Sequence, residues 1–238
     1  MREGRGSIDD LLGILIASSK KREGNKYTIN YQELLNDCKL FLFSGHETTS
    51  TLLAWTILLL SKHQDWQTRA RQEILATFGM NPPDYDGLHR LKILGQMKMV
   101  LNEVLRLYPP IPTLTRVIRG DDTTLGNLYI PKGTIVNLSV IHAHHNPKYW
   151  GNDAKEFNPE RFSEGIGKAT NGNMSFFPFG GGPRICIGQN LALVESKMAL
   201  SIILQRFAFE LSPSYVHAPT SVITLKPQHG AHVILHHV

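Results

Sequence analysis

The feature that most constrains the fold is a long apolar segment with helical periodicity, which runs from Tyr31 to about Ser61. At a rise of 1.5 Å per residue, some 30 helical residues span roughly 45 Å, the width of a large domain. Apolar side chains occur on nearly all sides of this helix, so it should be buried. Asn30, with Glu33 three residues later, resembles a capping box at its start, with Asn in place of Ser or Thr.

Composition excludes several classes of protein. The chain has 238 residues, of which 42% are hydrophobic and 19% charged, so a disordered tail, a coiled coil and a collagen-like repeat are ruled out. A net charge of +5 without a long basic run does not indicate a nucleic-acid partner. Two cysteines are too few for a disulfide scaffold or a four-cysteine zinc site, and they fit a reducing intracellular compartment. No apolar run reaches the length of a bilayer span.

The remaining pattern predicts a mainly α fold with small antiparallel β-sheets. Helices are expected over 10–18, 65–78, 95–107 and from 188 to about 207, and a turn over 81–87. Short β-branched segments that punctuating residues separate predict strands over 115–118, 123–130, 133–141, 207–211, 222–227 and 231–238. The stretch from about 144 to 184 should be irregular, with one short element at most, and a loop of that length is usually functional or disordered.

The most informative segment is FGGGPRICIG, from Phe179 to Gly188. One cysteine, Cys186, ends a glycine-rich loop just before a predicted helix, whose first backbone N–H groups favour a thiolate. Arg184 adds a positive charge, and the glycines let the backbone approach a large flat group. A buried structural cysteine is the alternative for an arbitrary sequence. A phosphate loop is disfavoured, because no Lys-Ser/Thr follows the glycines.

A second unusual segment, SGHETTS, interrupts the middle of the long helix. Gly45 costs about 1 kcal/mol relative to Ala inside a helix, and Glu47 resists burial. Such a conflict between local propensity and surroundings is expected at functional sites. The alternative is that Thr48 hydrogen-bonds to its own backbone and only bends the helix.

Four motifs in order resemble those of the cytochrome P450 family. FGGGPRICIG is similar to its haem-ligand signature F-x-x-G-x-R-x-C-x-G, through Phe179, Gly182, Arg184, Cys186 and Gly188. NEVLR contains the family's E-x-x-R as Glu103 and Arg106, and residues 159–162 give its PERF signature. SGHETT resembles the oxygen-activating [AG]-G-x-[DE]-T-[TS], except that Ser44 replaces Ala or Gly. The resemblance covers nearly the whole chain.

The resemblance implies a role for each matching residue. Cys186 would be the axial ligand of the iron in haem b, and Phe179, Gly182, Gly188 and two arginines, Arg116 and Arg184, would bind the cofactor. Arg116 could instead be a surface strand residue. Glu47 and Thr48 would deliver protons to bound dioxygen, and Ser44, Thr113 and Leu114 would line the substrate pocket.

A structural triad of Glu103, Arg106 and Arg161 is also implied by the resemblance. Glu103 and Arg106 share one helix face because they are three residues apart. An exposed pair of this kind would contribute only ~0.5 kcal/mol, which is the alternative interpretation. In the family the pair is buried, and with the arginine of PERF it clamps the loop that leads to the cysteine.

The resemblance also implies that residues 1–238 form a single incomplete domain, the C-terminal portion of the P450 fold. Family chains are about twice as long. The N-terminal membrane anchor would be missing here, so membrane contact would come only through that anchor. A full-length protein of the plant microsomal type would lie on the cytosolic face of the endoplasmic reticulum membrane.

The function implied is a monooxygenase that inserts one atom of O2 into a small apolar substrate, such as a terpenoid or hormone. Electrons would come from NADPH through NADPH–cytochrome P450 reductase. The alternative is a truncated, non-catalytic fragment that binds haem weakly or not at all. A zinc site is disfavoured, because the spacings of His142, His144, His145, His236 and His237 match no common ligand pattern.

Overall fold

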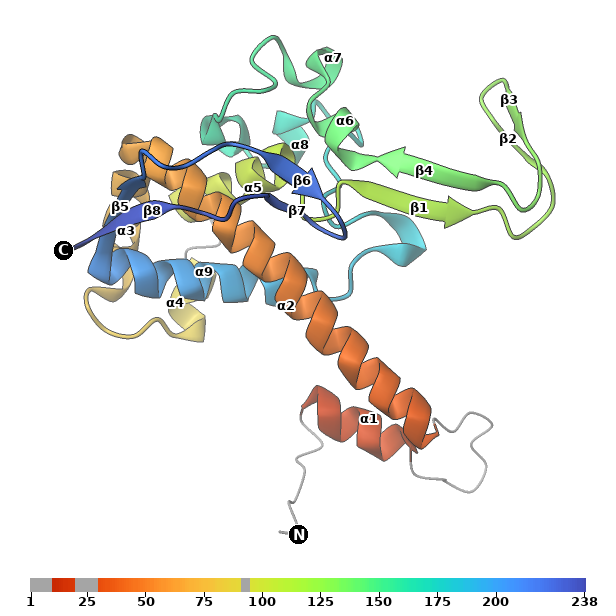
Figure 1. The fold of residues 1–238 in the computed structure, drawn as a ribbon, viewed down its shortest axis with the longest axis horizontal. Coiled ribbons are helices and arrows are strands. Elements are labelled where there is room, and N and C mark those ends of the chain that lie inside the picture. Colours follow the sequence, from red (N-terminus) through yellow and green to blue (C-terminus); the bar gives the residue numbers. More distant parts are fainter. Residues whose placement is uncertain (1–9, 20–29, 91–94) are drawn as a thin grey trace. The chain divides into compact units, whose positions relative to one another are not determined.

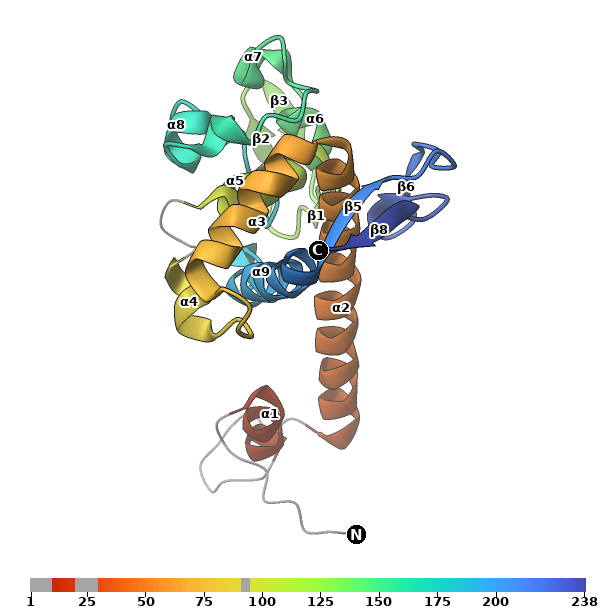
Figure 2. The same cartoon turned by 90° about the vertical axis from the view of Figure 1, so that its left-hand side faces the viewer.

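The structure is a computed structural model, and it describes residues 10–19, 30–90 and 95–238. The chain divides into two compact units, Met1–Glu47 and Thr48–Val238. The organisation as a single incomplete domain stays a prediction. The expected class is confirmed, because the described residues form helices and four small antiparallel sheets (Figures 1 and 2).

The first unit contains α1 (Leu11–Ser19) and the beginning of α2 (Tyr31–Lys62). The Asp10 carboxylate accepts a hydrogen bond from the Gly13 N–H at 2.6 Å, whereas the expected start at Ser7 lies outside the described residues. The capping box at the start of α2 is confirmed. The Asn30 N–H donates to Glu33 Oε2 and the Glu33 N–H donates to Asn30 Oδ1, both at 2.9 Å.

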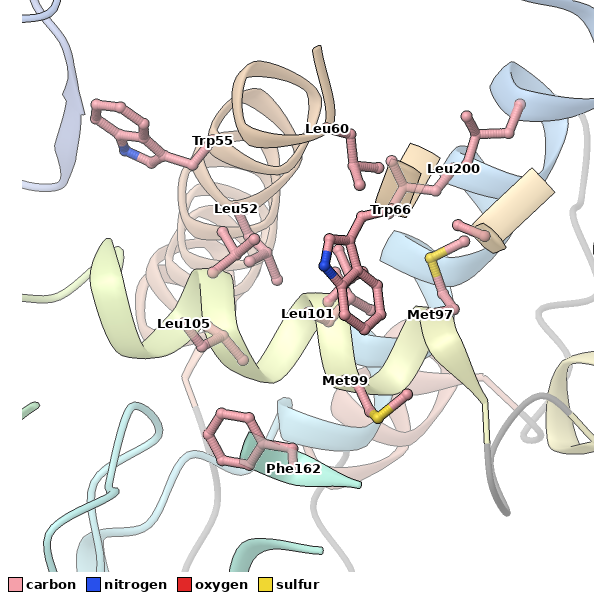
Figure 3. Close-up of a cluster of buried hydrophobic side chains, with 14 of the residues drawn as sticks. Leu52, Trp55, Leu60, Trp66, Met97, Met99, Leu101, Leu105, Phe162 and Leu200 are labelled. Carbon is pink, nitrogen blue, oxygen red and sulfur yellow. The ribbon is translucent and has the colours of Figure 1, made fainter. Parts of the chain in front are cut away.

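The second unit is built around the end of α2 and three helices, α3 (Gln64–Phe78), α5 (Gln96–Leu107) and α9 (Gln189–Arg206), with α3 packed on both α5 and α9. The burial predicted for α2 holds in this unit, where Leu52, Trp55 and Leu60 are at most 2% exposed. It does not hold in the first unit, where Leu42 is 76% exposed. Figure 3 shows how side chains from these helices converge in one core.

Each sheet of the second unit pairs two antiparallel strands. The pairs are β1 (Thr113–Val117) with β4 (Ile135–Ser139), β2 (Thr123–Leu125) with β3 (Leu128–Ile130), β5 (Phe207–Leu211) with β8 (Val233–His237), and β6 (Pro219–Ser221) with β7 (Leu225–Pro227). In the β1–β4 pair Thr113 lies opposite Ser139, and in the β5–β8 pair Leu211 lies opposite Val233. Figure 1 shows the β2–β3 hairpin beyond the end of the β1–β4 ladder.

The strand expected over 222–227 is present only as β7, and its partner β6 was not expected. Two further boundaries are wrong, because local side chains start helices there. α4 (Tyr85–Arg90) replaces the end of the expected turn, and the Asp84 carboxylate accepts the Gly87 N–H at 2.6 Å. α6 (Val140–His144) replaces the end of the expected strand, because the Ser139 hydroxyl accepts a hydrogen bond from the His142 N–H.

The stretch from 144 to 184 is also more ordered than expected. Several short helical turns follow one another along it, although each is only three or four residues long. The first is capped by Asn146, whose side chain accepts the Lys148 N–H at 3.0 Å. The turns are α7 (Pro147–Trp150), the 3-10 turn η1 (Pro159–Phe162), α8 (Ile166–Ala169) and the 3-10 turn η2 (Gly182–Arg184).

None of the helices in the described ranges is both long enough and apolar enough to cross a membrane.

Candidate functional site

The glycine-rich loop is closed on itself by backbone hydrogen bonds that place its cysteine at the surface. The Cys186 N–H donates to the Phe179 carbonyl at 2.9 Å, which fixes the two ends of the loop together. Gly180 and Gly182 have φ values of +73° and +65°, in the left-handed region that disfavours residues with a Cβ. Cys186 is a free and exposed thiol, and α9 begins three residues after it.

The surroundings of Cys186 fit the haem that the sequence implies. A thiol that is open on one side can bind a metal, and soft thiolates suit iron. Ile185 and Ile187, on either side of it, are 49% and 85% exposed and offer an apolar surface to a flat ring. The exposed guanidinium of Arg184 can pair with carboxylates at the ring's edge. The donor set and its apolar border therefore match a haem with an axial thiolate.

Strand β1 borders this loop. A Cβ built on Gly180 would lie 3.7 Å from Leu114 Cδ1, so the Leu114 side chain lies against the loop backbone. Because side chains alternate along a strand, Arg116 shares the face of Leu114 and Thr113 points to the other. Leu114 and Arg116 are half-buried and Thr113 is exposed, in agreement with this alternation. The structure thus brings Leu114 to the cysteine loop and leaves Thr113 facing away from it.

The polar segment of α2 crosses the boundary between the two units. Ser44 and Glu47 belong to the first unit, which ends at Glu47, and Thr48 begins the second. All three lie on one continuous helix, where Glu47 and Thr48 are half-buried and Ser44 is exposed. Their roles in proton delivery and in the substrate pocket stay predictions.

Glu103 and Arg106 form a fully buried bidentate ion pair on α5. Arg106 Nε donates to Glu103 Oε2 and Arg106 Nη2 donates to Glu103 Oε1, both at 2.7 Å, and neither side chain is exposed. Arg106 also donates to the carbonyls of His144 at 2.9 Å, Glu156 at 3.0 Å and Ala154. The alternative of a loosely exposed pair is therefore wrong.

Arg161 joins the same network from η1. Its Nε lies 3.4 Å from Glu103 Oε1, and the Asn158 N–H donates to that same oxygen at 2.9 Å. Arg161 also donates to the Trp150 carbonyl at 3.1 Å and pairs with the Asp153 carboxylate at 2.6 Å. The hydrogen bond from Arg161 lowers the pKa of Asp153. The structure thus brings the three residues of the expected triad together.

A buried histidine, which its sequence neighbours do not single out, links this network to the cysteine loop. His144 is fully buried, and its Nε2 accepts the Phe177 N–H at 3.0 Å while its carbonyl accepts from Arg106. Burial lowers the pKa of His144 to about 4, so the ring is neutral at pH 7. The sequence showed only a cluster of histidines. Among the described residues, no three His, Cys, Asp or Glu side chains are grouped to hold a metal.

Comparison with known proteins agrees with this geometry. The family model described as Cytochrome P450 matches residues 2–232. The chain is 57% identical to echinocystic acid 23-monooxygenase of Saponaria officinalis, over 97% of its own length and 45% of that protein's.

Two more relatives match nearly the whole length of this chain and a similar share of their own. The chain is 55% identical to 11-oxo-beta-amyrin 30-oxidase of Glycyrrhiza uralensis and 52% identical to 7-deoxyloganic acid hydroxylase of Catharanthus roseus, over 99% and 98% of its own length. It spans about 45% of the length of each of these curated relatives. With four signature motifs and a family match over nearly all of its length, the chain belongs to the cytochrome P450 family.

Proposed function

We propose that this chain carries the haem-binding and oxygen-activating part of a monooxygenase. The observation that carries the proposal is the exposed Cys186 thiol, on a loop whose ends are joined by a hydrogen bond, between an apolar border and the start of α9. When bound, haem with a thiolate ligand supplies the activation of O2 for insertion of one oxygen atom into a substrate.

The residues around Cys186 would bind and orient the cofactor. The Cys186 thiolate would ligate the iron, and the guanidinium groups of Arg116 and Arg184 would pair with the haem propionates. Phe179, Gly182 and Gly188 would shape the loop. A Cβ on Gly188 would lie 3.9 Å from the Cys186 sulfur, so this glycine is next to the ligand atom.

Two side chains on α2 would supply protons. Glu47 can hold and exchange a proton with solvent, and the Thr48 hydroxyl can both accept and donate a hydrogen bond. Together they form an acid–alcohol pair that passes protons toward the site of oxygen binding. Leu114, whose side chain lies against the cysteine loop, would contribute to the substrate pocket.

The names of the relatives support a terpenoid substrate. They describe oxidation of echinocystic acid, 11-oxo-beta-amyrin and 7-deoxyloganic acid by those proteins. We infer a small apolar substrate of this kind, with electrons supplied from NADPH by NADPH–cytochrome P450 reductase. We place the whole protein on the cytosolic face of the endoplasmic reticulum membrane.

The absorption spectrum of the reduced, carbon-monoxide-bound chain with added haem tests the proposal. The wild-type chain should give the red-shifted Soret band of thiolate ligation. Cys186→Ala should lose this band, whereas Cys38→Ala, the same substitution at the other free cysteine, should keep it. A folded wild-type chain without bound haem, or with only a shorter-wavelength band, would favour the alternative of a non-catalytic fragment.

A further inference from the structure

A cavity of about 420 Å³ lies in the second unit against the cysteine loop. Its walls come from α4, α5, the beginning of α9 and the segment that precedes Cys186. Its volume is in the range of about 300–1,000 Å³ that is usual for small-molecule sites. The residues that decide its chemistry are Lys98, Leu101, Asn102, Phe176, Phe179 and Leu193.

The cavity contains a buried amide that lacks a partner. Asn102 is only 6% exposed, and its Nδ2 has no hydrogen-bond partner among the described residues. A buried donor of this kind is costly to leave unsatisfied, and such groups are rare in folded proteins. An acceptor oxygen on a bound ligand would satisfy it.

The charges around the cavity favour an anionic ligand. Lys98 lies one turn before Asn102 on α5, is half-buried, and makes no ion pair with a described side chain. Gln189 and Asn190 place the first turn of α9 in the wall, and its N-cap Gly188 provides no side-chain cap. The start of a helix carries a partial positive charge. Lys197 also lines the cavity, but it interacts with the Glu73 carboxylate.

The rest of the wall is apolar. Leu101 is 1% exposed, and Phe176, Phe179 and Leu193 are half-buried side chains that would cover the body of a ligand. Phe179 belongs to the cysteine loop, and its carbonyl accepts the Cys186 N–H. A ligand here would therefore pack directly against the loop that holds the thiol.

We propose that this cavity is a binding site for a small apolar carboxylic acid, whose carboxylate contacts Asn102 and Lys98 and whose hydrocarbon body contacts Phe176, Phe179 and Leu193. Phe179, Gly180 and Ile185 of the cysteine loop line this cavity, whereas Cys186 itself is not among its lining residues. Its occupant would buttress the cysteine loop, and so act as an effector of the loop rather than as a substrate.

Calorimetric titration of the 238-residue chain with 4-phenylbutyrate tests the proposal. Saturable binding with one site is expected, and the neutral 4-phenylbutan-1-ol should bind at least about 10-fold more weakly, since it lacks the charge. Asn102→Leu should weaken phenylbutyrate binding by about 10-fold or more. Lys98→Met should also weaken it, whereas Lys132→Met, which removes the same charge at the exposed turn after β3, should not.

Leu193→Trp is the second line of evidence, because a larger ring at this wall fills the cavity without removing a polar group. It should abolish binding while the circular dichroism spectrum remains that of the folded chain. The titration is repeated with Cys186→Ala, which should bind phenylbutyrate as the wild type does, so that failure of haem ligation and failure of this site are distinguished. Absence of saturable binding to the folded wild-type chain, or unchanged binding by Leu193→Trp, would overturn the proposal.

Discussion

The sharpest test of the fold around the cysteine loop is the substitution Arg106→Met. It keeps an apolar stem of similar length but removes the guanidinium group from a site with no solvent exposure. Glu103 would then keep only the Asn158 N–H at 2.9 Å and the longer contact of 3.4 Å with Arg161. The carbonyls of His144, Glu156 and Ala154 would also lose their donor.

The size of the effect follows from this burial. Removal of one partner of a buried ion pair costs about 3–5 kcal/mol, because the other charge remains uncompensated. Arg69→Met is a matched control. Arg69 pairs with Glu160 at 2.6 Å, but the two side chains are 39% and 50% exposed, and such a surface pair is worth about 0–1 kcal/mol.

Urea unfolding followed by far-ultraviolet circular dichroism measures both variants. With a slope of about 2 kcal/mol per molar urea, a loss of about 4 kcal/mol lowers the midpoint by about 2 M for Arg106→Met. Arg69→Met should shift it by no more than about 0.5 M. If the two variants had equal midpoints, the view that the buried network holds the second unit together would be refuted.

Three further predictions concern single interactions. Because burial lowers the pKa of His144 to about 4 from 6.5, its contribution to stability is complete above pH 6.5. As the pH falls to 4, about 3 kcal/mol should be lost, at about 1.4 kcal/mol per pH unit. Urea titrations between pH 6.5 and pH 4 should show this loss of stability, and His144→Asn should remove most of the pH dependence. Gly87→Ala would place a Cβ in steric conflict with the Phe78 ring and should cost about 1–3 kcal/mol by thermal unfolding. Gly167→Ala, with no atom within 4 Å, is its control and should cost far less. Asn30→Ala should cost about 1 kcal/mol at the start of α2, measured as faster hydrogen exchange of the Glu33 amide.

The sequence was sufficient to predict the features that depend on neighbouring residues. The start of α2 follows from the reciprocal bonds of Asn30 and Glu33, which need no other part of the chain. Glu103 and Arg106 share a helix face because of their spacing, so their contact was also predictable. Strands β2 and β3 pair as a hairpin, because Gly126 and Asn127 mark the turn between them.

Features that depend on distant residues were not predictable in the same way. The burial of Arg106 requires carbonyls from residues 38 to 50 positions later, and no local pattern announces them. The short turns between 144 and 184 were missed because each is too brief to show a periodicity. His144 looked like one of several clustered histidines, and only the fold shows that it is buried and shares hydrogen bonds with two other segments.

His144 also connects the triad of Glu103, Arg106 and Arg161 to the cysteine loop through a series of hydrogen bonds. Arg106 holds the His144 carbonyl, the His144 ring accepts the Phe177 N–H, and the Phe177 carbonyl accepts the Gly180 N–H at 2.9 Å. Three hydrogen bonds therefore connect the buried guanidinium to the loop that ends at Cys186. A neutral ring is essential, because a protonated Nε2 would face the Phe177 N–H as a second donor. The family resemblance implied a clamp on this loop, and in this chain His144 transmits it. Because burial lowers the pKa of His144, the ring stays neutral and its Nε2 can accept the hydrogen bond.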